Sequence, residues 1–227
     1  MTVMELDCRR TRGRPQARQD DATHHLIAEA ARRSFMAHGY AGTNMDNVAK
    51  CAGISKKTLY RLVSGKAELF RVAVSDRIAG FLMTVDEDVV GSLDITAGLE
   101  RLLTEFGNLV LADQTIELYK LVIAESDRFP ELAVDFYTEA IEGTLPVLEN
   151  FLRRHCADGT LTLDDPHLAA GMLRGMMILE PQRAVMMGKA PIPSRSEIAG
   201  RAQACARLFL GGCLARPPEP ATPLQTV

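Results

Sequence analysis

Apolar side chains recur about every 3.6 residues through almost the whole chain, which is the pattern of amphipathic α-helices. Alternating apolar and polar residues, which would indicate β-strands, form no run long enough to predict a sheet. The pattern therefore predicts an all-α protein. The expected helices cover about residues 26–38, 44–52, 55–63, 66–85, 94–111, 115–127, 130–155, 165–187 and 194–214.

Charge is divided unevenly along the 227 residues. The first 75 residues carry 13 Lys and Arg against 7 Asp and Glu, whereas the rest of the chain carries 13 against 22. A basic N-terminal part joined to an acidic remainder indicates that one end of the protein meets a polyanion and the other does not. The hydrophobic fraction of 47% is ample for a buried core and excludes a disordered chain.

Several classes of protein are disfavoured by what the sequence contains. The longest nearly apolar run, from Leu168 to Leu179, has 12 residues and includes Arg174, so it is too short to span a bilayer. Five cysteines, an odd number without a Cys-x-x-Cys pair, indicate reduced thiols and a cytoplasmic protein. Histidine spacing suited to a metal is absent, as are nucleotide-binding and nucleophile motifs. We therefore expect no enzyme, no metal site and no cofactor.

Two short helices joined at Gly53 are the most informative part of the sequence. Thr43 precedes the first helix and Ser55 precedes the second, and a hydroxyl at such a position can cap an orphan amide of the first turn. The apolar positions of the second helix lie on one face. The opposite face is a polar stripe of Lys56, Lys57, Tyr60 and Arg61.

These polar side chains suit phosphate oxygens and base edges. The major groove of DNA is about 12 Å wide and admits one α-helix, so the pattern predicts a helix-turn-helix whose second helix reads DNA. The alternative is a solvated charged face on a small helical hairpin.

The run from Leu26 to Phe70 resembles the DNA-binding domain of the TetR (tetracycline-repressor) family of bacterial regulators. The resemblance rests on the aromatic-x-x-x-Gly-Tyr end of the first helix and on a dense set of matches after it. These matches are Thr43, Val48-Ala49, Ala52-Gly53, Ser55, Thr58-Leu59-Tyr60 and Lys66-x-x-Leu. The family is all-α, with three N-terminal helices for DNA and a larger C-terminal body for dimerisation and a small-molecule inducer.

The resemblance implies roles for individual residues. Thr43, Tyr60 and Lys66 match the usual phosphate contacts of the family. The start of the second helix, where bases are read, corresponds to Ser55, Lys56, Lys57 and Thr58, and Arg61 lies on the same exposed stripe. Lys57 replaces a frequent small residue, and Leu62-Val63 stand where a His or Tyr with Phe is commoner. The replacement at Leu62-Val63 puts in doubt the polar contact that a His or Tyr would make from this turn of the helix.

The expected organisation has four parts. Residues 1–19 form a flexible basic arm, residues 20–72 the DNA-binding domain, residues 73–215 a helical ligand-binding and dimerisation domain, and residues 216–227 a disordered Pro-rich tail. In the family, the last two helices build a four-helix dimer interface. Small residues in the corresponding helices of this chain would allow the helices of two protomers to approach closely across a two-fold axis. The alternative is that they pack within one chain only. These residues are Ala169, Ala170, Gly171, Gly175, Ala202 and Ala206.

A ligand cavity in the C-terminal body is expected to take an apolar or aromatic inducer, because methionines and aromatics adapt to such molecules. The candidate lining residues, each of which could instead be plain core, are Phe106, Tyr119, Phe136, Tyr137, Met172 and Met176. The sequence thus predicts a homodimeric repressor that a small molecule releases from a palindromic double-stranded DNA operator. A ligand-independent DNA-binding regulator and an activator are the alternatives.

Overall fold

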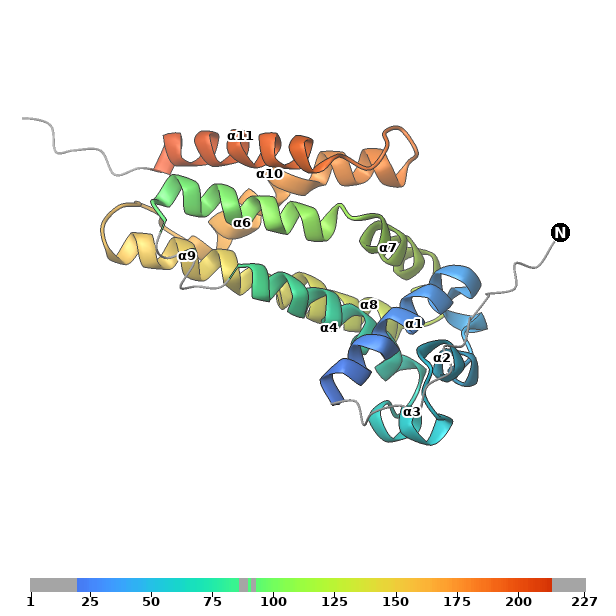
Figure 1. Cartoon of the computed structure of the whole chain (residues 1–227). Helices are drawn as coiled ribbons and strands as arrows, with labels where there is room; N and C mark the ends of the chain where they lie inside the picture. The colour runs from blue at the N-terminus through green and yellow to red at the C-terminus, as the bar shows by residue number, and fades with distance from the viewer. Residues whose placement is uncertain (1–19, 86–89, 91–92, 214–227) are drawn as a thin grey trace, which may run out of the picture.

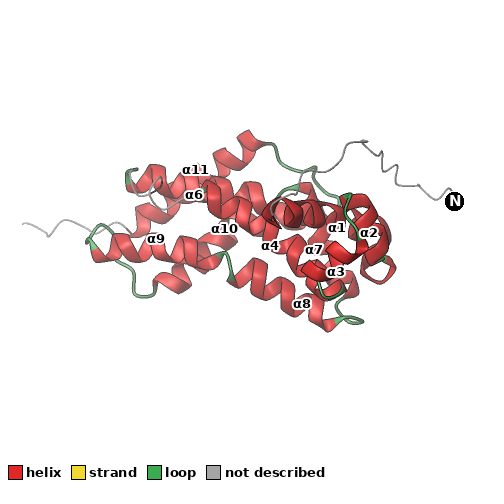
Figure 2. Cartoon of the chain, turned by 60° about the horizontal axis from the view of Figure 1, so that its bottom comes forward, coloured by secondary structure: helices red, strands yellow, loops and turns green. Residues whose placement is uncertain are grey.

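The computed structural model describes residues 20–85, 90 and 93–213. Every regular element of these ranges is a helix, as Figure 2 shows, so the predicted all-α class is confirmed. None of the helices in these ranges is long and apolar enough to cross a membrane. Cys51, Cys156 and Cys205 form no disulfide bond with one another. The expected basic arm (1–19) and Pro-rich tail (216–227) lie outside the described residues.

The N-terminal helices are α1, which is kinked at Gly39, and the two short helices α2 and α3. The long helix α4 follows them and leads into the remaining helices. The bounds are α1 Asp20–Gly42, α2 Met45–Ala52, α3 Lys56–Leu62, α4 Lys66–Thr84, α6 Ile95–Val110, α7 Asp113–Glu125, α8 Pro130–Phe136, the π-helix η1 Tyr137–Glu142, α9 Leu145–Ala157, α10 Pro166–Met186 and α11 Arg195–Cys213.

The single helix predicted over residues 130–155 is wrong, because the structure divides it into α8, η1 and α9. Pro146, the second residue of α9, has no N–H to donate to the carbonyl four residues earlier, so the helical ladder cannot continue through it. Gly143 lies between η1 and α9, where the Cβ of any other residue would clash with the carbonyl oxygen of Glu139. The Thr144 hydroxyl donates instead to the Ala140 carbonyl at 2.7 Å.

Two clusters of buried apolar side chains hold the molecule together. One cluster joins α1–α4 to α7 and α8, through residues such as Phe35, Leu59 and Leu118. The other joins the far end of α4 to α6, α9, α10 and α11, through residues such as Phe81 and Leu173. Because α4 contributes to both clusters, it packs against the N-terminal helices at one end and against the remaining helices at the other.

Figure 1 shows α1, α2 and α3 gathered at one end of an elongated molecule, with α4 running from them beneath α6. Helix α6 packs against both α4 and α11, and α7 packs against α1. Helix α4 also runs unbroken through residues 72 and 73, the predicted domain boundary, which stays a prediction.

Candidate nucleic-acid interface

The turn between α2 and α3 is built on Gly53. Its φ of 70° and ψ of 27° are left-handed, a conformation that glycine adopts without a steric penalty. The Gly53 N–H donates to the Lys50 carbonyl at 3.2 Å, and the Ile54 N–H donates to the Ala49 carbonyl at 3.0 Å. This pair of bonds is the Schellman motif, which ends α2 and sends the chain directly into α3.

Helix α3 has one buried and one exposed face. The Ser55 hydroxyl accepts a hydrogen bond from the Thr58 N–H at 3.0 Å, so Ser55 is the N-cap predicted from the sequence. Leu59 is fully buried and fixes the helix on the core. The opposite face is exposed to solvent and carries Lys56, Lys57, Tyr60 and Arg61, with Tyr60 at 53% exposure. Three cations and a phenol thus project from one short helix.

The cations of this face differ in their surroundings. Lys56 Nζ pairs with the carboxylate of Asp46, the second residue of α2, and both side chains are well exposed. Lys57 makes no ion pair with another described residue. A phosphate approaching α3 therefore meets Lys57 directly, whereas it competes with Asp46 for Lys56.

Lys66 and Thr43 lie where α1, α2 and α4 meet. Lys66 Nζ donates to the Ala41 carbonyl at 2.8 Å and lies 5.5 Å from the centre of the Tyr40 ring. Tyr40 packs in turn on Phe129, and burial raises the pKa of its phenol. Lys66 thus holds a positive charge at the C-terminal end of α1, close to the helix-turn-helix.

Thr43 is 3% exposed, and its hydroxyl donates to the Gly39 carbonyl at 2.8 Å. The N-cap of α2 is Asn44, whose side chain accepts from the Asp46 N–H at 2.8 Å, so the N-cap position expected for Thr43 is wrong. Asn44 serves because its carbonyl oxygen reaches the first-turn amides while the Thr43 hydroxyl is occupied within the fold. The phosphate contacts of Thr43, Tyr60 and Lys66 stay predictions.

Two short helices joined by a tight turn, with the second one exposing donors and cations, are able to enter a major groove. Residues 27–73, which contain this unit, match the domain family described as bacterial regulatory proteins of the tetR family. Residues 97–212, more than half of the chain, match the C-terminal domain of AefR-like transcriptional repressors. The chain belongs to the TetR family of transcriptional regulators.

Relatives within the TetR family extend over most of the chain. The HTH-type transcriptional regulator YhgD of Bacillus subtilis is 29% identical over 154 residues, which are 67% of this chain and 79% of that protein. The structure of a TetR-family regulator from Mesorhizobium loti is 26% identical, with a TM-score of 0.73 over 87% of this chain and 100% of the other. The flavonoid-responsive regulator FrrA is 25% identical, with a TM-score of 0.68 and the same coverage.

The residues predicted to line a ligand cavity do not gather at one place in this TetR-family structure. Phe106 lines a cavity in the C-terminal body. Tyr119 and Phe136 instead pack edge to face, 5.4 Å apart, in the cluster that supports the N-terminal helices. Tyr137 and Met172 are 57% and 60% exposed, and Met176 is exposed as well. A role in ligand binding stays a prediction for all six residues.

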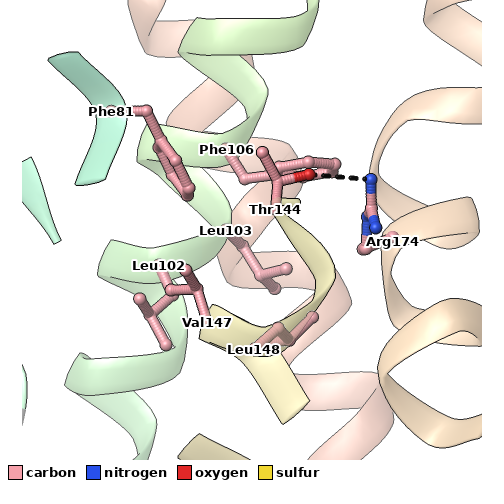
Figure 3. A pocket seen from close by; sticks show the side chains of 8 residues that line it. All are labelled: Phe81, Leu102, Leu103, Phe106, Thr144, Val147, Leu148 and Arg174. Carbon is pink, nitrogen blue, oxygen red and sulfur yellow. Dashed lines mark hydrogen bonds between the residues drawn. The ribbon is translucent and has the colours of Figure 1, made fainter. Parts of the chain in front are cut away.

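The cavity beside Phe106 contains a polar pair that sequence reasoning did not select. Arg174 on α10 is 8% exposed and donates to the Thr144 hydroxyl at 3.1 Å (Figure 3). The space is about 10 Å³, room for one water molecule, among side chains of α4, α6, α9 and α10. A signal was present, since Arg174 is the one charge in the apolar run from Leu168 to Leu179. The cavity is lined by Phe81, Leu102, Leu103, Phe106, Thr144, Val147, Leu148 and Arg174.

Proposed function

We propose that this TetR-family regulator is a homodimeric repressor that acts in the cytoplasm and leaves a palindromic operator when a small molecule binds its C-terminal body. The exposed face of α3 carries the proposal. Lys57, Tyr60 and Arg61 project outward while Leu59 anchors the helix, which is the arrangement that a recognition helix needs. Lys56 and Lys57 at the start of α3 would read bases together with Ser55 and Thr58, and Lys66 would hold a phosphate.

An exposed apolar stripe on α10 supports the homodimer. Leu168, Met172, Met176 and Leu179 follow one another at intervals of three or four residues and are all exposed, so they share one face of the helix. Contiguous apolar surface of this kind is costly in water, and a second copy related by a two-fold axis would cover it.

The small residues of α10 and α11 support this interface only in part. Ala170, Ala202 and Ala206 are fully buried within one chain, where they allow close packing of the helices of a single protomer. Gly171 is exposed and lies beside the apolar stripe. The proposed dimer contact is therefore made mainly by large apolar side chains and only locally by close backbone approach.

Release from DNA by a ligand is supported by the cavity inside the C-terminal body, because α4 forms part of the cavity wall. Phe81 of α4 lines this cavity, and the same helix begins at Lys66 beside the helix-turn-helix. A ligand that prefers one arrangement of α4 would change DNA affinity by its coupling free energy. The relative FrrA is described as flavonoid-responsive, which supports a small-molecule effector here.

DNA binding is tested by selecting from a random duplex library with the full-length protein. We expect enrichment of inverted repeats whose half-sites lie about one helical turn apart, with an affinity that falls steeply as salt rises. Substitution of Lys57 by Ala should weaken some selected sequences more than others, since Lys57 is expected to read bases. Failure to enrich any sequence, together with no dependence on salt, would refute the proposal.

The dimer is tested by sedimentation of two matched variants. Met172→Glu places a charge in the apolar stripe and should shift the protein from dimer to monomer. Met83→Glu changes an even more exposed methionine on α4, outside the stripe, and should leave the dimer intact. A wild-type monomer, or equal behaviour of the two variants, would show that α10 does not form the interface.

A further inference from the structure

Arg174 is a buried cation without a carboxylate partner among the described residues. Its guanidinium donates to the Ile141 carbonyl at 2.9 Å and to the Thr144 hydroxyl at 3.1 Å, and it lies 4.8 Å from the centre of the Phe106 ring. All three partners are uncharged. Burial lowers the pKa of Arg174 to about 10, so the side chain remains protonated at neutral pH.

Placing a charge in the protein interior costs free energy that neutral hydrogen bonds offset only partly. Arg32, which is also buried, illustrates the usual solution, since it pairs with Asp76 at 2.9 Å and with Glu29 at 2.8 Å. Arg174 has no such compensation. It also keeps unused hydrogen-bonding capacity, because a guanidinium has five N–H donors and only two are occupied by Ile141 and Thr144.

A second, larger space adjoins the cavity of Arg174. This groove has a volume of about 710 Å³ and shares Leu102 and Val147 with the wall of the cavity. Most of its described lining residues are apolar, and none of the described residues that line either space is acidic. The groove is lined by Leu82, Val85, Val90, Leu102, Gly143, Pro146, Val147, Asn150, Phe151 and Arg154.

We propose that the C-terminal body binds an amphipathic organic acid, whose carboxylate pairs with Arg174 and whose apolar part occupies the adjoining groove. A planar carboxylate matches the guanidinium fork and supplies the negative charge that the interior lacks. The cavity at Arg174 has a volume of only about 10 Å³, so the acid enters by displacing the side chains of Leu102 and Val147, which line both the cavity and the groove. This inference rests on the proposed ligand-released function and specifies the chemical class of the ligand.

Two pairs of probes test the inference, and the members of each pair share an apolar part but carry either a carboxylate or an uncharged hydroxyl. They are decanoate with 1-nonanol and 2-naphthoate with 2-naphthol, measured by calorimetry on the full-length protein. In at least one pair the acid is expected to bind about tenfold more tightly than its alcohol, since a charge-assisted bond to Arg174 is formed only by the acid. Arg174→Gln should remove this preference.

Arg154→Gln is the matched control, because Arg154 lines the groove but is exposed. The preference for the acid should survive there. If Arg174→Gln does not fold, Arg174→Lys decides the question, since it keeps the charge but loses the planar fork and should reduce the preference about threefold or more.

The inference is overturned if neither wild-type pair favours the acid, if folded Arg174→Gln keeps the preference, or if Arg154→Gln loses it. An unchanged preference in Arg174→Lys also overturns it when Arg174→Gln is unfolded. DNA binding is measured separately, so the two proposals fail in different ways. A protein that binds operator DNA without favouring acids refutes this inference alone, whereas one that favours acids without binding DNA refutes the proposed function.

Discussion

The ion pair between Asp46 and Lys56 sits on the proposed DNA-binding surface, and removing its acidic member should strengthen DNA binding. Asp46→Asn keeps the shape of the side chain and removes one negative charge beside the start of α3. In the wild type this carboxylate competes with phosphate for Lys56 and repels the DNA backbone. The variant leaves Lys56 without its partner, so its long side chain is able to contact a flanking phosphate in addition to the base edges that it is proposed to read. Asp46→Asn should therefore bind DNA more tightly at low salt, with a steeper loss as salt rises.

The size of the effect follows from counterion release. Each phosphate newly neutralised by a cation adds about 0.9 to the slope of log affinity against log salt, so two copies of Lys56 in the proposed dimer add at most about 1.8. Between 50 and 200 mM salt, that slope corresponds to about tenfold more loss of affinity than in the wild type. The cost to folding is small, about 1 kcal/mol, because the pair is exposed and Asp46 also interacts with the N-terminus of α2.

The assay is fluorescence anisotropy with a selected inverted repeat, titrated at several salt concentrations from about 50 to 200 mM. Glu117→Gln is the matched control, since Glu117 forms an exposed ion pair of 2.9 Å with Lys120 on α7, away from α2 and α3. The slope should be unchanged there. In a Lys56→Gln background, Asp46→Asn should lose most of its effect. A slope for Asp46→Asn equal to that of the wild type, or an equal change in Glu117→Gln, would refute the reasoning.

Three further predictions concern the stability of the fold, each measured by urea unfolding. Gly53→Ala should destabilise the protein by about 1 kcal/mol, because an alanine at φ 70° is strained although space is free around it; an unchanged midpoint would contradict this. Gly107→Ala should cost about 1–3 kcal/mol, because its Cβ would lie 2.6 Å from Met177 Cε and overfill the core; a stabilised variant would show that α6 can shift. Hydrogen bonds from the hydroxyl and the N–H of Ser64 hold the pKa of Glu68 below its ordinary value. This depressed pKa stabilises the fold fully above the unfolded-state pKa, and the contribution is lost as pH falls through the folded-state pKa. The free energies of unfolding of wild type and Glu68→Gln should therefore differ most near neutral pH and converge once the pH is below the folded-state pKa; a constant difference would exclude this role.

The parts of the fold that were predictable from the sequence are those set by local chemistry. Gly53 ends α2 and Ser55 caps α3 because a left-handed glycine and a hydroxyl N-cap act within a few residues of the chain. The break in residues 130–155 escaped prediction because apolar periodicity continues through it. Pro146 is also compatible with a helix start, so by itself it does not show where the preceding helix ends.

The candidate DNA-binding face was accessible to sequence reasoning for the same reason. The periodicity of one short helix suffices to separate Leu59 from Lys57 and Tyr60. The ligand residues depend on packing between distant helices, and residue type does not determine it. Met172 lies on the exposed side of α10, whereas Arg174, two residues further, points into the interior although it is charged.

The contacts of Arg174 also indicate how a ligand bound there would be sensed at the DNA-binding end. Arg174 holds the carbonyl of Ile141 in η1, and Glu139 of the same π-helix accepts a hydrogen bond of 3.0 Å from Ser75 on α4. A carboxylate that draws the guanidinium away from Ile141 removes one of the bonds that hold this π-helix in place. Since α4 packs on η1 and also begins beside the helix-turn-helix, a change in η1 is transmitted through one rigid helix. The proposed ligand site and α3 are therefore connected by few contacts. These are the hydrogen bonds from Arg174 to Ile141 and from Ser75 to Glu139, together with α4, which follows α3 in the chain.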